Sequence, residues 1–363
     1  MILIDIKAAL DSIEHHLLCS KLEKIGIRRK ALDVIESYLR GRRQAVYYGN
    51  VISKTKEVVR GVPQGSCLDP ILFNLMIHDI QYLKIDATYS CFADDLVIVF
   101  RHENEENLLE SIKEGIAQIQ DYYTKNGLEI NMQKSEYIIF NNKHPSTVIH
   151  FLDDINMKHE TKVKYLGAVL DNKLNMSHHT MHIKDKIEGS LNALRLIRSK
   201  STSLLLTFYF SFIHSHLQGN AFLLIRASTE NVKELQILQN SALKIVYKLD
   251  RLHSTIDIYK NVATGILPIV GLIYLSILIM TKNAIISNRL GNINLPSIEL
   301  WKERRSEGMA KIPTAKKNIL RNDMICIGPK LYNQMPKSIR DIEDLNRFKR
   351  MVKLFFLEKL TYY

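Results

Sequence analysis

The chain has 363 residues, of which 46% are apolar and 24% charged, which is an ordinary composition for a protein that folds around its own cores. Its 4 cysteines lie far apart without zinc-ligand or disulfide spacing, and its first residues are too acidic for a secretory signal. These features exclude a disulfide-rich domain and favour a reducing, intracellular compartment. The net charge of +12 is uneven, because residues 1–145 hold 18 basic and 20 acidic side chains and residues 146–363 hold 32 and 18. The basic second part suggests a polyanion partner, although a solubilising surface explains the charge equally well.

The first 150 residues alternate short strands and helices. Apolar runs and turn residues predict strands at 1–6 and 136–140 and hairpins at 44–59, turning at Gly49-Asn50, and 89–100. Apolar residues at helical spacing predict helices at 15–26, 28–41, 70–83 and 103–127.

After residue 150 the sequence predicts one more hairpin, near 162–176, and then helices to the end. Ser201–Ile225 and Val262–Met280 carry no formal charge and are long enough to span a membrane. The first stretch contains several polar side chains, and Pro268 and Gly271 break the second. We therefore expect buried helices and no membrane partner.

The stretch "FADD" places Asp94 and Asp95 side by side between two apolar strands. Two anions there are costly unless divalent cations lie between them. If the strand "MILID" is a neighbour, Asp5 joins the pair, and such hard oxygen ligands suit Mg²⁺. Two such ions about 3.5–4 Å apart can stabilise both oxygens of a phosphoryl transfer. Taken alone, the pair is better explained as a solvated turn.

The segment "RGVPQGSCLDPILFNLMIHDI" combines a stiff turn with the start of a helix. Gly61, Pro63 and Gly65 allow close backbone approach, and Gln64 offers a neutral amide for a sugar or a base edge. A lone "PQG" is typical of any turn.

In chain order, "LIDIKAALDSIEH", "SYLRGRRQAV", "GVPQGSCLDPILFNLMIHDI", "FADD", "GLEINMQKSEYIIF" and "KYLGAVLD" resemble the palm of a reverse transcriptase, most closely that of non-LTR (LINE-type, jockey-like) retrotransposons. "LTFYFSFIHSHLQ" resembles the thumb of that family, and "MPKSIRDIEDLNRFK" its C-terminal end, which argues against a group II intron or telomerase-like polymerase.

The resemblance implies an α+β fold. We expect a polymerase-type palm, an antiparallel sheet backed by helices, over 1–150, a primer-grip hairpin and helical thumb over 151–250, and a helical C-terminal region over 251–363.

The resemblance also implies the site. It makes Asp5, Asp94 and Asp95 catalytic ligands of two Mg²⁺ ions, for which Mn²⁺ can substitute, and Lys134 a candidate proton donor to the leaving pyrophosphate. The expected nucleotide-binding residues are Ile6, Leu10, Gln64 and Gly65, and the expected primer and template contacts are Arg42, Arg43, Tyr165, Leu166 and Gly167.

The implied reaction joins a dNTP to a primer 3′-OH, with an RNA template and a DNA primer as partners and with phosphate contacts from the basic second part. As alternatives, Lys134 is an exposed turn lysine, and Arg42 and Arg43 belong to a solvated loop. The family implies a location in cytoplasm and nucleus.

Three departures favour a second reading, a catalytically inactive, truncated remnant that only binds nucleic acid. The chain starts four residues before Asp5, so the fingers region and the endonuclease of the family are expected to be absent. Leu10 replaces a family aromatic, which predicts weaker exclusion of ribonucleotides. The thumb segment Gln218–Ile225 also differs from the family pattern.

Overall fold

The computed structural model describes residues 1–140, 145–289, 309–312 and 324–360. These residues form two compact units, 1–163 and 164–363, which are described separately below. Each unit has its own apolar core. The mixed α+β class is confirmed. The finer division at residues 150 and 250 stays a prediction, and part of its last region lies outside the described residues.

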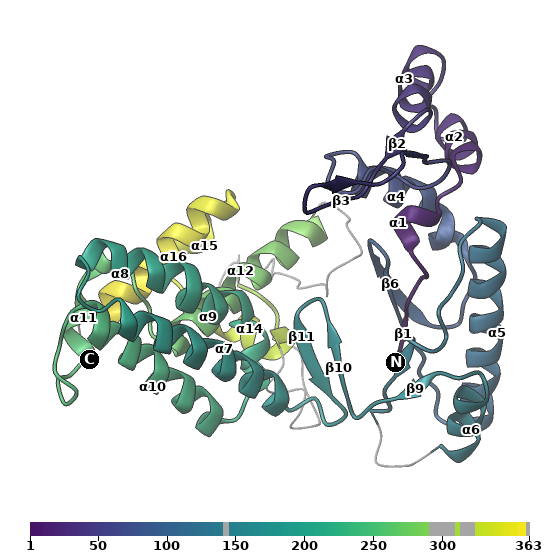
Figure 1. Cartoon of the computed structure of the whole chain (residues 1–363). Helices are drawn as coiled ribbons and strands as arrows, with labels where there is room; N and C mark the ends of the chain where they lie inside the picture. Colours follow the sequence, from purple (N-terminus) through teal and green to yellow (C-terminus); the bar gives the residue numbers. More distant parts are fainter. Residues whose placement is uncertain (141–144, 290–308, 313–323, 361–363) are drawn as a thin grey trace. The chain divides into compact units, whose positions relative to one another are not determined.

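The first unit is built on a five-stranded sheet with the order β6-β7-β1-β8-β9 (Figure 1). Its central strand β1 (Ile2–Ile4) runs antiparallel to β7 (Asp95–Val99) and to β8 (Glu136–Tyr137), and β7 forms a hairpin with β6 (Thr88–Phe92). The last strand, β9 (Lys158–His159), pairs parallel to β8. The parallel pair requires a crossover, which α6 (Ser146–Asp154) supplies.

Helices pack on this sheet through apolar side chains that recur at helical spacing. The longest is α5 (Glu105–Lys125), which buries Ile112, Ile116, Ile119 and Tyr123 in the same core as β1 and β7. Asn104 caps it by accepting the N–H of Asn107, so the acidic start and the stop near Gly127 follow the prediction. The other helices of the unit are α1 (Ala9–Ser12), α2 (His15–Lys24), α3 (Lys30–Leu39) and α4 (Asp69–Ile77), which continues as the 3₁₀ turn η1 (His78–Tyr82).

The predicted hairpin at 44–59 forms, but as two short ribbons. β2 (Arg43–Gln44) pairs with β5 (Lys56–Glu57), and β3 (Tyr47–Tyr48) pairs with β4 (Val51–Ile52) around the Gly49-Asn50 turn. The side chains of these strands are exposed on both faces, with Tyr48 at 86%.

The second unit begins at Lys164, inside the first strand of a hairpin, and continues as a helical bundle. β10 (Lys162–Tyr165) and β11 (Ala168–Asp171) form the hairpin, and α7 (Ser177–Leu196) follows. The elements that complete the bundle are α8 (Thr202–Tyr209), the π-helical turn η2 (Phe210–His214), α9 (Ser215–Asn220), η3 (Leu223–Arg226), α10 (Thr229–Val246), α11 (Ile256–Lys260), η4 (Val262–Thr264), α12 (Ile269–Arg289), α14 (Met324–Gln334), α15 (Lys337–Arg340) and α16 (Leu345–Leu360).

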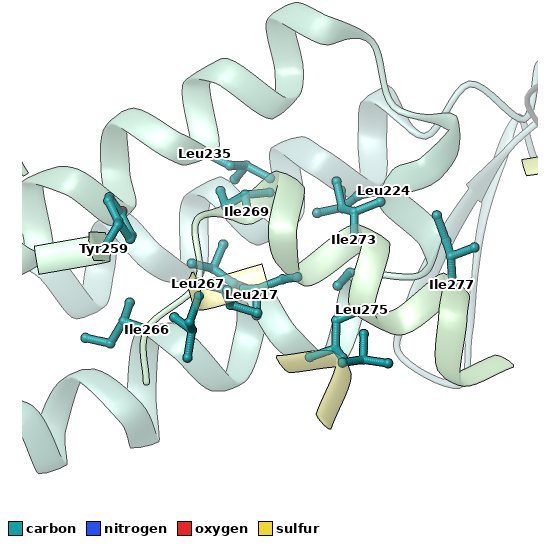
Figure 2. Packing of buried hydrophobic residues seen from close by; sticks show 14 of the residues in the cluster. Leu217, Leu224, Leu235, Tyr259, Ile266, Leu267, Ile269, Ile273, Leu275 and Ile277 are labelled. Carbon is teal, nitrogen blue, oxygen red and sulfur yellow. The ribbon is translucent and has the colours of Figure 1, made fainter. Parts of the chain in front are cut away.

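The core of the bundle draws on segments far apart in the sequence (Figure 2). Leu217 of α9, Leu235 of α10 and Ile273 of α12 belong to one buried cluster. Gln239 is buried in the same region and stays satisfied, because its Nε2 donates to the Tyr209 hydroxyl at 3.1 Å and to the Leu267 carbonyl at 2.9 Å.

The first uncharged stretch is mostly helical, and the second is helical over Val262–Thr264 and from Ile269 onward. Both contribute buried side chains, as expected. Among the described residues one helix, α12, is long and apolar enough to cross a membrane, over Ile269–Ser287, and 56% of that window is buried inside the bundle. The helix begins directly after Pro268. The expectation that Gly271 breaks it is wrong, since Gly271 lies inside its first turn.

Candidate active site

The sheet register brings the three aspartates of the prediction to one edge of the first unit. β1 pairs with β7 as Ile2 with Ile98, Leu3 with Val97 and Ile4 with Leu96. The next step of this register sets Asp5 opposite Asp95. Opposed residues of an antiparallel pair point their side chains to the same face, with Cβ atoms about 5 Å apart.

Asp94 joins them through a two-residue turn. Phe92 pairs with Asp95, so Ala93 and Asp94 alone connect β6 to β7. Ala93 adopts a left-handed conformation with φ 51°. An alanine pays about 1 kcal/mol for this conformation, which glycine adopts freely. The strain lies directly beside the carboxylate pair.

Electrostatics agree with this convergence. Burial raises the pKa of Asp95, and the negative charges of Asp94 and Asp5 raise it further. The carboxylates are therefore close enough to repel one another. Among the described residues no group of at least 3 His, Cys, Asp or Glu side chains is placed so that it could hold a metal ion. Carboxylate oxygens are the ligands that Mg²⁺ prefers, and a cation between the three side chains would relieve their mutual repulsion.

The backbone of Asp5 is fixed by a neighbouring loop. Its N–H donates to Ser135 Oγ at 3.1 Å, and its carbonyl accepts the N–H of Asn131 at 2.8 Å. Ser135 is fully buried and also donates to the Asn131 carbonyl. Sequence reasoning missed Ser135, and its one signal was a small polar residue at the start of a predicted strand.

The "PQG" turn packs directly on α1, four residues beyond Asp5. The N–H of Gly61 donates to the Ile13 carbonyl at 2.8 Å, and that of Val62 donates to the Leu10 carbonyl at 3.0 Å. Gly61 has φ 78°, and a Cβ atom there would lie 2.7 Å from the Cα of Asp11. The turn and the helix therefore form one unit that only glycine permits.

Gln64 and Gly65 are held within this turn. Gln64 Nε2 donates to Asp11 Oδ1 at 2.9 Å, so its amide reaches the first unit's α1. The N–H of Gly65 donates to Asp69 Oδ2 at 2.8 Å. Asp69 is 6% exposed and lies in the first turn of α4, where a carboxylate is favoured. It is a second structural residue that sequence reasoning missed.

The other residues predicted to act at the nucleotide differ in their exposure. Ile6 is 6% exposed and bridges to Ile130, so its side chain belongs to the core. Leu10 is half-buried, on α1 beside the "PQG" turn. Lys134 is exposed in the loop before β8, and its N–H donates to the Asn131 carbonyl at 3.1 Å.

The two arginines predicted to bind the primer and template differ in their contacts and exposure. Arg42 Nε donates to the Leu39 carbonyl at 3.0 Å, and Arg42 Nη2 donates to the Gly61 carbonyl. Its guanidinium therefore braces the "PQG" turn. Arg43 is exposed on β2.

The predicted primer-grip residues lie in the second unit, at the tip of the β10–β11 hairpin. Tyr165 ends β10, and Leu166 and Gly167 form a two-residue turn with φ 46° and 83°. Two successive positive φ values are the type I′ arrangement that matches strand twist.

Comparison with known proteins found one matching family. A family described as "Reverse transcriptase (RNA-dependent DNA polymerase)" matches residues 1–170. The chain is 27% identical over 251 residues to "Probable RNA-directed DNA polymerase from transposon X-element" of Drosophila melanogaster, which covers 67% of this chain and 28% of that protein. It is also 27% identical over 188 residues to "RNA-directed DNA polymerase from mobile element jockey" of the same organism, covering 50% of this chain and 20% of that protein.

The chain thus spans less than a third of the length of these relatives. Among solved structures it is similar to "Structure of telomerase from Candida albicans in complexe with TWJ fragment of telomeric RNA", with 12% identity, a TM-score of 0.34, and coverage of 76% of this chain and 48% of that one.

Proposed function

We propose that the chain carries the palm and thumb of an RNA-directed DNA polymerase from a non-LTR retrotransposon, because its residues 1–170 match the reverse transcriptase family. The α+β sheet of the first unit is the polymerase-type palm. The observation that supports the activity most directly is the β1–β7 register, whose continuation by one residue sets Asp5 opposite Asp95, beside Asp94.

The proposed reaction is the attack of a primer 3′-OH on the α-phosphate of a dNTP, with pyrophosphate as the leaving group. Asp5, Asp94 and Asp95 would hold Mg²⁺, which when bound supplies charge stabilisation to the oxygens of the transferring phosphoryl group. The backbone bonds from Ser135 and Asn131 hold Asp5 in place for that task.

Other residues of the chain would bind and orient the nucleotide and the template. Gln64, fixed by Asp11, presents the rim of the "PQG" turn to the nucleotide, and Leu10 lies beside that turn. Exposed Lys134 is the candidate proton donor to the leaving pyrophosphate. An RNA template supplies sequence by base pairing, so the protein needs phosphate contacts, which the basic excess of residues 146–363 supports.

A primer-extension assay tests the proposal. The full chain is given an RNA template, a labelled DNA primer, dNTPs and Mg²⁺, and we expect extension that EDTA abolishes. Asp94→Asn removes one carboxylate and should abolish extension while nucleic-acid binding remains. Asp86→Asn is the matched control, since Asp86 is also an exposed aspartate of the first unit.

Metal binding gives a readout that does not depend on turnover. Titration with Mn²⁺, followed by electron paramagnetic resonance, should show a site that weakens at least about tenfold in Asp94→Asn, because a carboxylate ligand is lost. Nucleic-acid binding that weakens with salt, together with unchanged Mn²⁺ affinity and no extension, would instead support the inactive remnant.

A further inference from the structure

The β10–β11 hairpin is attached to α7 through a buried histidine. The backbone N–H of Val169, in β11, donates to His179 Nδ1 at 3.2 Å. His179 is the third residue of α7 and its exposed fraction is 0%. The contact joins the strand that follows the Leu166-Gly167 turn to the first turn of a long helix.

Hairpin geometry explains why Val169 needs a partner. Residues that flank a two-residue turn, here Tyr165 and Ala168, form a hydrogen-bonded pair, and the next pair, Lys164 and Val169, does not exchange hydrogen bonds. The N–H of Val169 therefore points away from β10. A buried N–H without an acceptor is costly, and His179 supplies the acceptor.

This bond requires the neutral imidazole. Because Val169 is the donor, Nδ1 must carry a lone pair, and the ring proton resides on Nε2. A protonated ring carries N–H on both nitrogens, so it turns the acceptor into a second donor facing the N–H of Val169. Protonation removes the bond rather than weakening it.

The surroundings keep His179 neutral near pH 7. Burial lowers its pKa from the usual 6.5, and neighbouring His182 lowers it further, while Asn220 of α9 acts in the opposite direction. The pKa of His182 is itself lowered by burial and by Lys186 and Lys164.

The charged and titratable groups around this contact come from each packed element. They are Lys164 and Asp171 of the hairpin, His182, Asp185 and Lys186 of α7, and His216 of α9. Burial, Lys186 and His182 lower the pKa of His216. Each imidazole that gains a proton therefore disfavours protonation of the neighbouring imidazoles. Acidification thus affects His179, His182 and His216 together.

We propose that neutral His179 is the positioning residue that holds the β10–β11 hairpin on α7, and that its protonation releases the hairpin and weakens the hold on the primer. The second half of this statement rests on the proposed function, in which Tyr165, Leu166 and Gly167 grip the primer. The unfolded or released form binds more protons below pH 6.5, so the attachment is complete above that value and is lost as the pH falls below it.

Hydrogen exchange at Val169 tests the contact directly. NMR on the full chain measures the protection factor of this amide at pH 7.5 and at pH 5.5, corrected for the intrinsic exchange rate. We expect a fall of up to about tenfold on acidification, the largest change that one proton with a usual pKa of 6.5 can cause over this range. Amides of the first unit's β7 serve as the internal reference and should change little.

Two substitutions at His179 separate titration from packing. Asparagine keeps an acceptor oxygen close to the position of Nδ1 and does not titrate, so His179→Asn should protect Val169 equally at both pH values. His179→Leu has no acceptor and should lose the protection at both. His178→Asn, at the exposed neighbouring position, should behave like the parent. If His179→Leu does not fold, the pH response of His179→Asn still decides whether titration of His179 controls the contact with Val169.

Primer-template affinity provides the functional readout. It should fall below pH 6.5 in the parent and stay level in His179→Asn. Equal pH responses of Val169 in the parent and His179→Asn would overturn the attachment. A Val169 response without a matching change in affinity would overturn the role in primer binding. Failure of the polymerase proposal is a different result, the absence of extension at every pH.

Discussion

The three carboxylates at the edge of the first unit repel one another, and the folded chain alone does not relieve this repulsion. Asp95 has a raised pKa because of burial and the charges of Asp94 and Asp5. The folded state therefore binds a proton more readily than the unfolded state, and stability declines as the pH rises from about 3.8 through the pKa of Asp95 in the folded protein.

Asp95→Asn should therefore stabilise the metal-free chain at pH 7. We expect a gain of about 0.5 kcal/mol from relieved cross-strand repulsion, measured by urea unfolding in EDTA, and no gain below pH 3.8. Adding Mg²⁺ should stabilise the parent and not the variant. A loss of stability at pH 7 in EDTA would show that the three charges do not oppose folding.

The turn residue Ala93 gives a second prediction at this scale. Its φ of 51° suits glycine, so Ala93→Gly should raise the free energy of unfolding by about 0.5–1 kcal/mol, despite the entropy that glycine adds to the unfolded chain. Ala87→Gly, just before β6, is the control and should lower it by a similar amount, because Ala87 has no positive φ. Urea unfolding of both variants measures the contrast in sign.

Single residues also show where sequence reasoning stopped. Asp94 and Asp95 carried a signal, because charges between apolar strands need an explanation, whereas Asp5 gained one only in combination with them. Ser135 offered only a small polar residue at the start of a predicted strand, and its partner Asp5 lies 130 residues away. Asp69 and His179 lie 4 and 10 residues from the backbone N–H groups that they accept, and neither stood out in the sequence. A hydrogen bond between distant segments leaves no periodic pattern in the sequence.

At the scale of elements, the "PQG" turn and α1 depend on two glycines in different ways. Gly61 and Gly65 both have positive φ, but a Cβ atom meets the backbone of Asp11 only at Gly61 and nothing within 4 Å at Gly65. Gly65→Ala should then cost about 1 kcal/mol, the backbone term alone.

Gly61→Ala should cost more than about 2 kcal/mol, because a clash with backbone atoms adds to the same conformational term. It should also displace Gln64 from Asp11. Thermal unfolding compares the two variants, and equal losses would show that the turn can move away from α1 without penalty.

Strong periodic elements were predictable and weakly patterned ones were not. α5 and the β6–β7 hairpin form where the apolar pattern placed them. α6 and the two-residue strand β9 were not predicted, because a short strand carries too few residues to show alternation. The π-helical turn η2 was also missed, since its extra residue changes the helical period only locally.

At the scale of the whole molecule, two cores mean two sources of stability. The buried side chains of the first unit and those of the second belong to separate clusters, and α12 contributes to the second. Leu278 of α12 is fully buried, whereas Tyr274, one turn earlier, is 39% exposed. This contrast allows one helix to be tested both as a core element and as a candidate membrane span.

Leu278→Ala should destabilise the second unit by about 2–5 kcal/mol, because it leaves a cavity in the core. Hydrogen exchange should show amides of α10 and α12 losing protection while those of β1 and β7 keep theirs, since the two clusters share no residue. Tyr274→Ala should have a smaller effect, in keeping with its exposure. A uniform loss over both units would mean that they unfold together, and no loss in either would mean that α12 does not belong to a packed core.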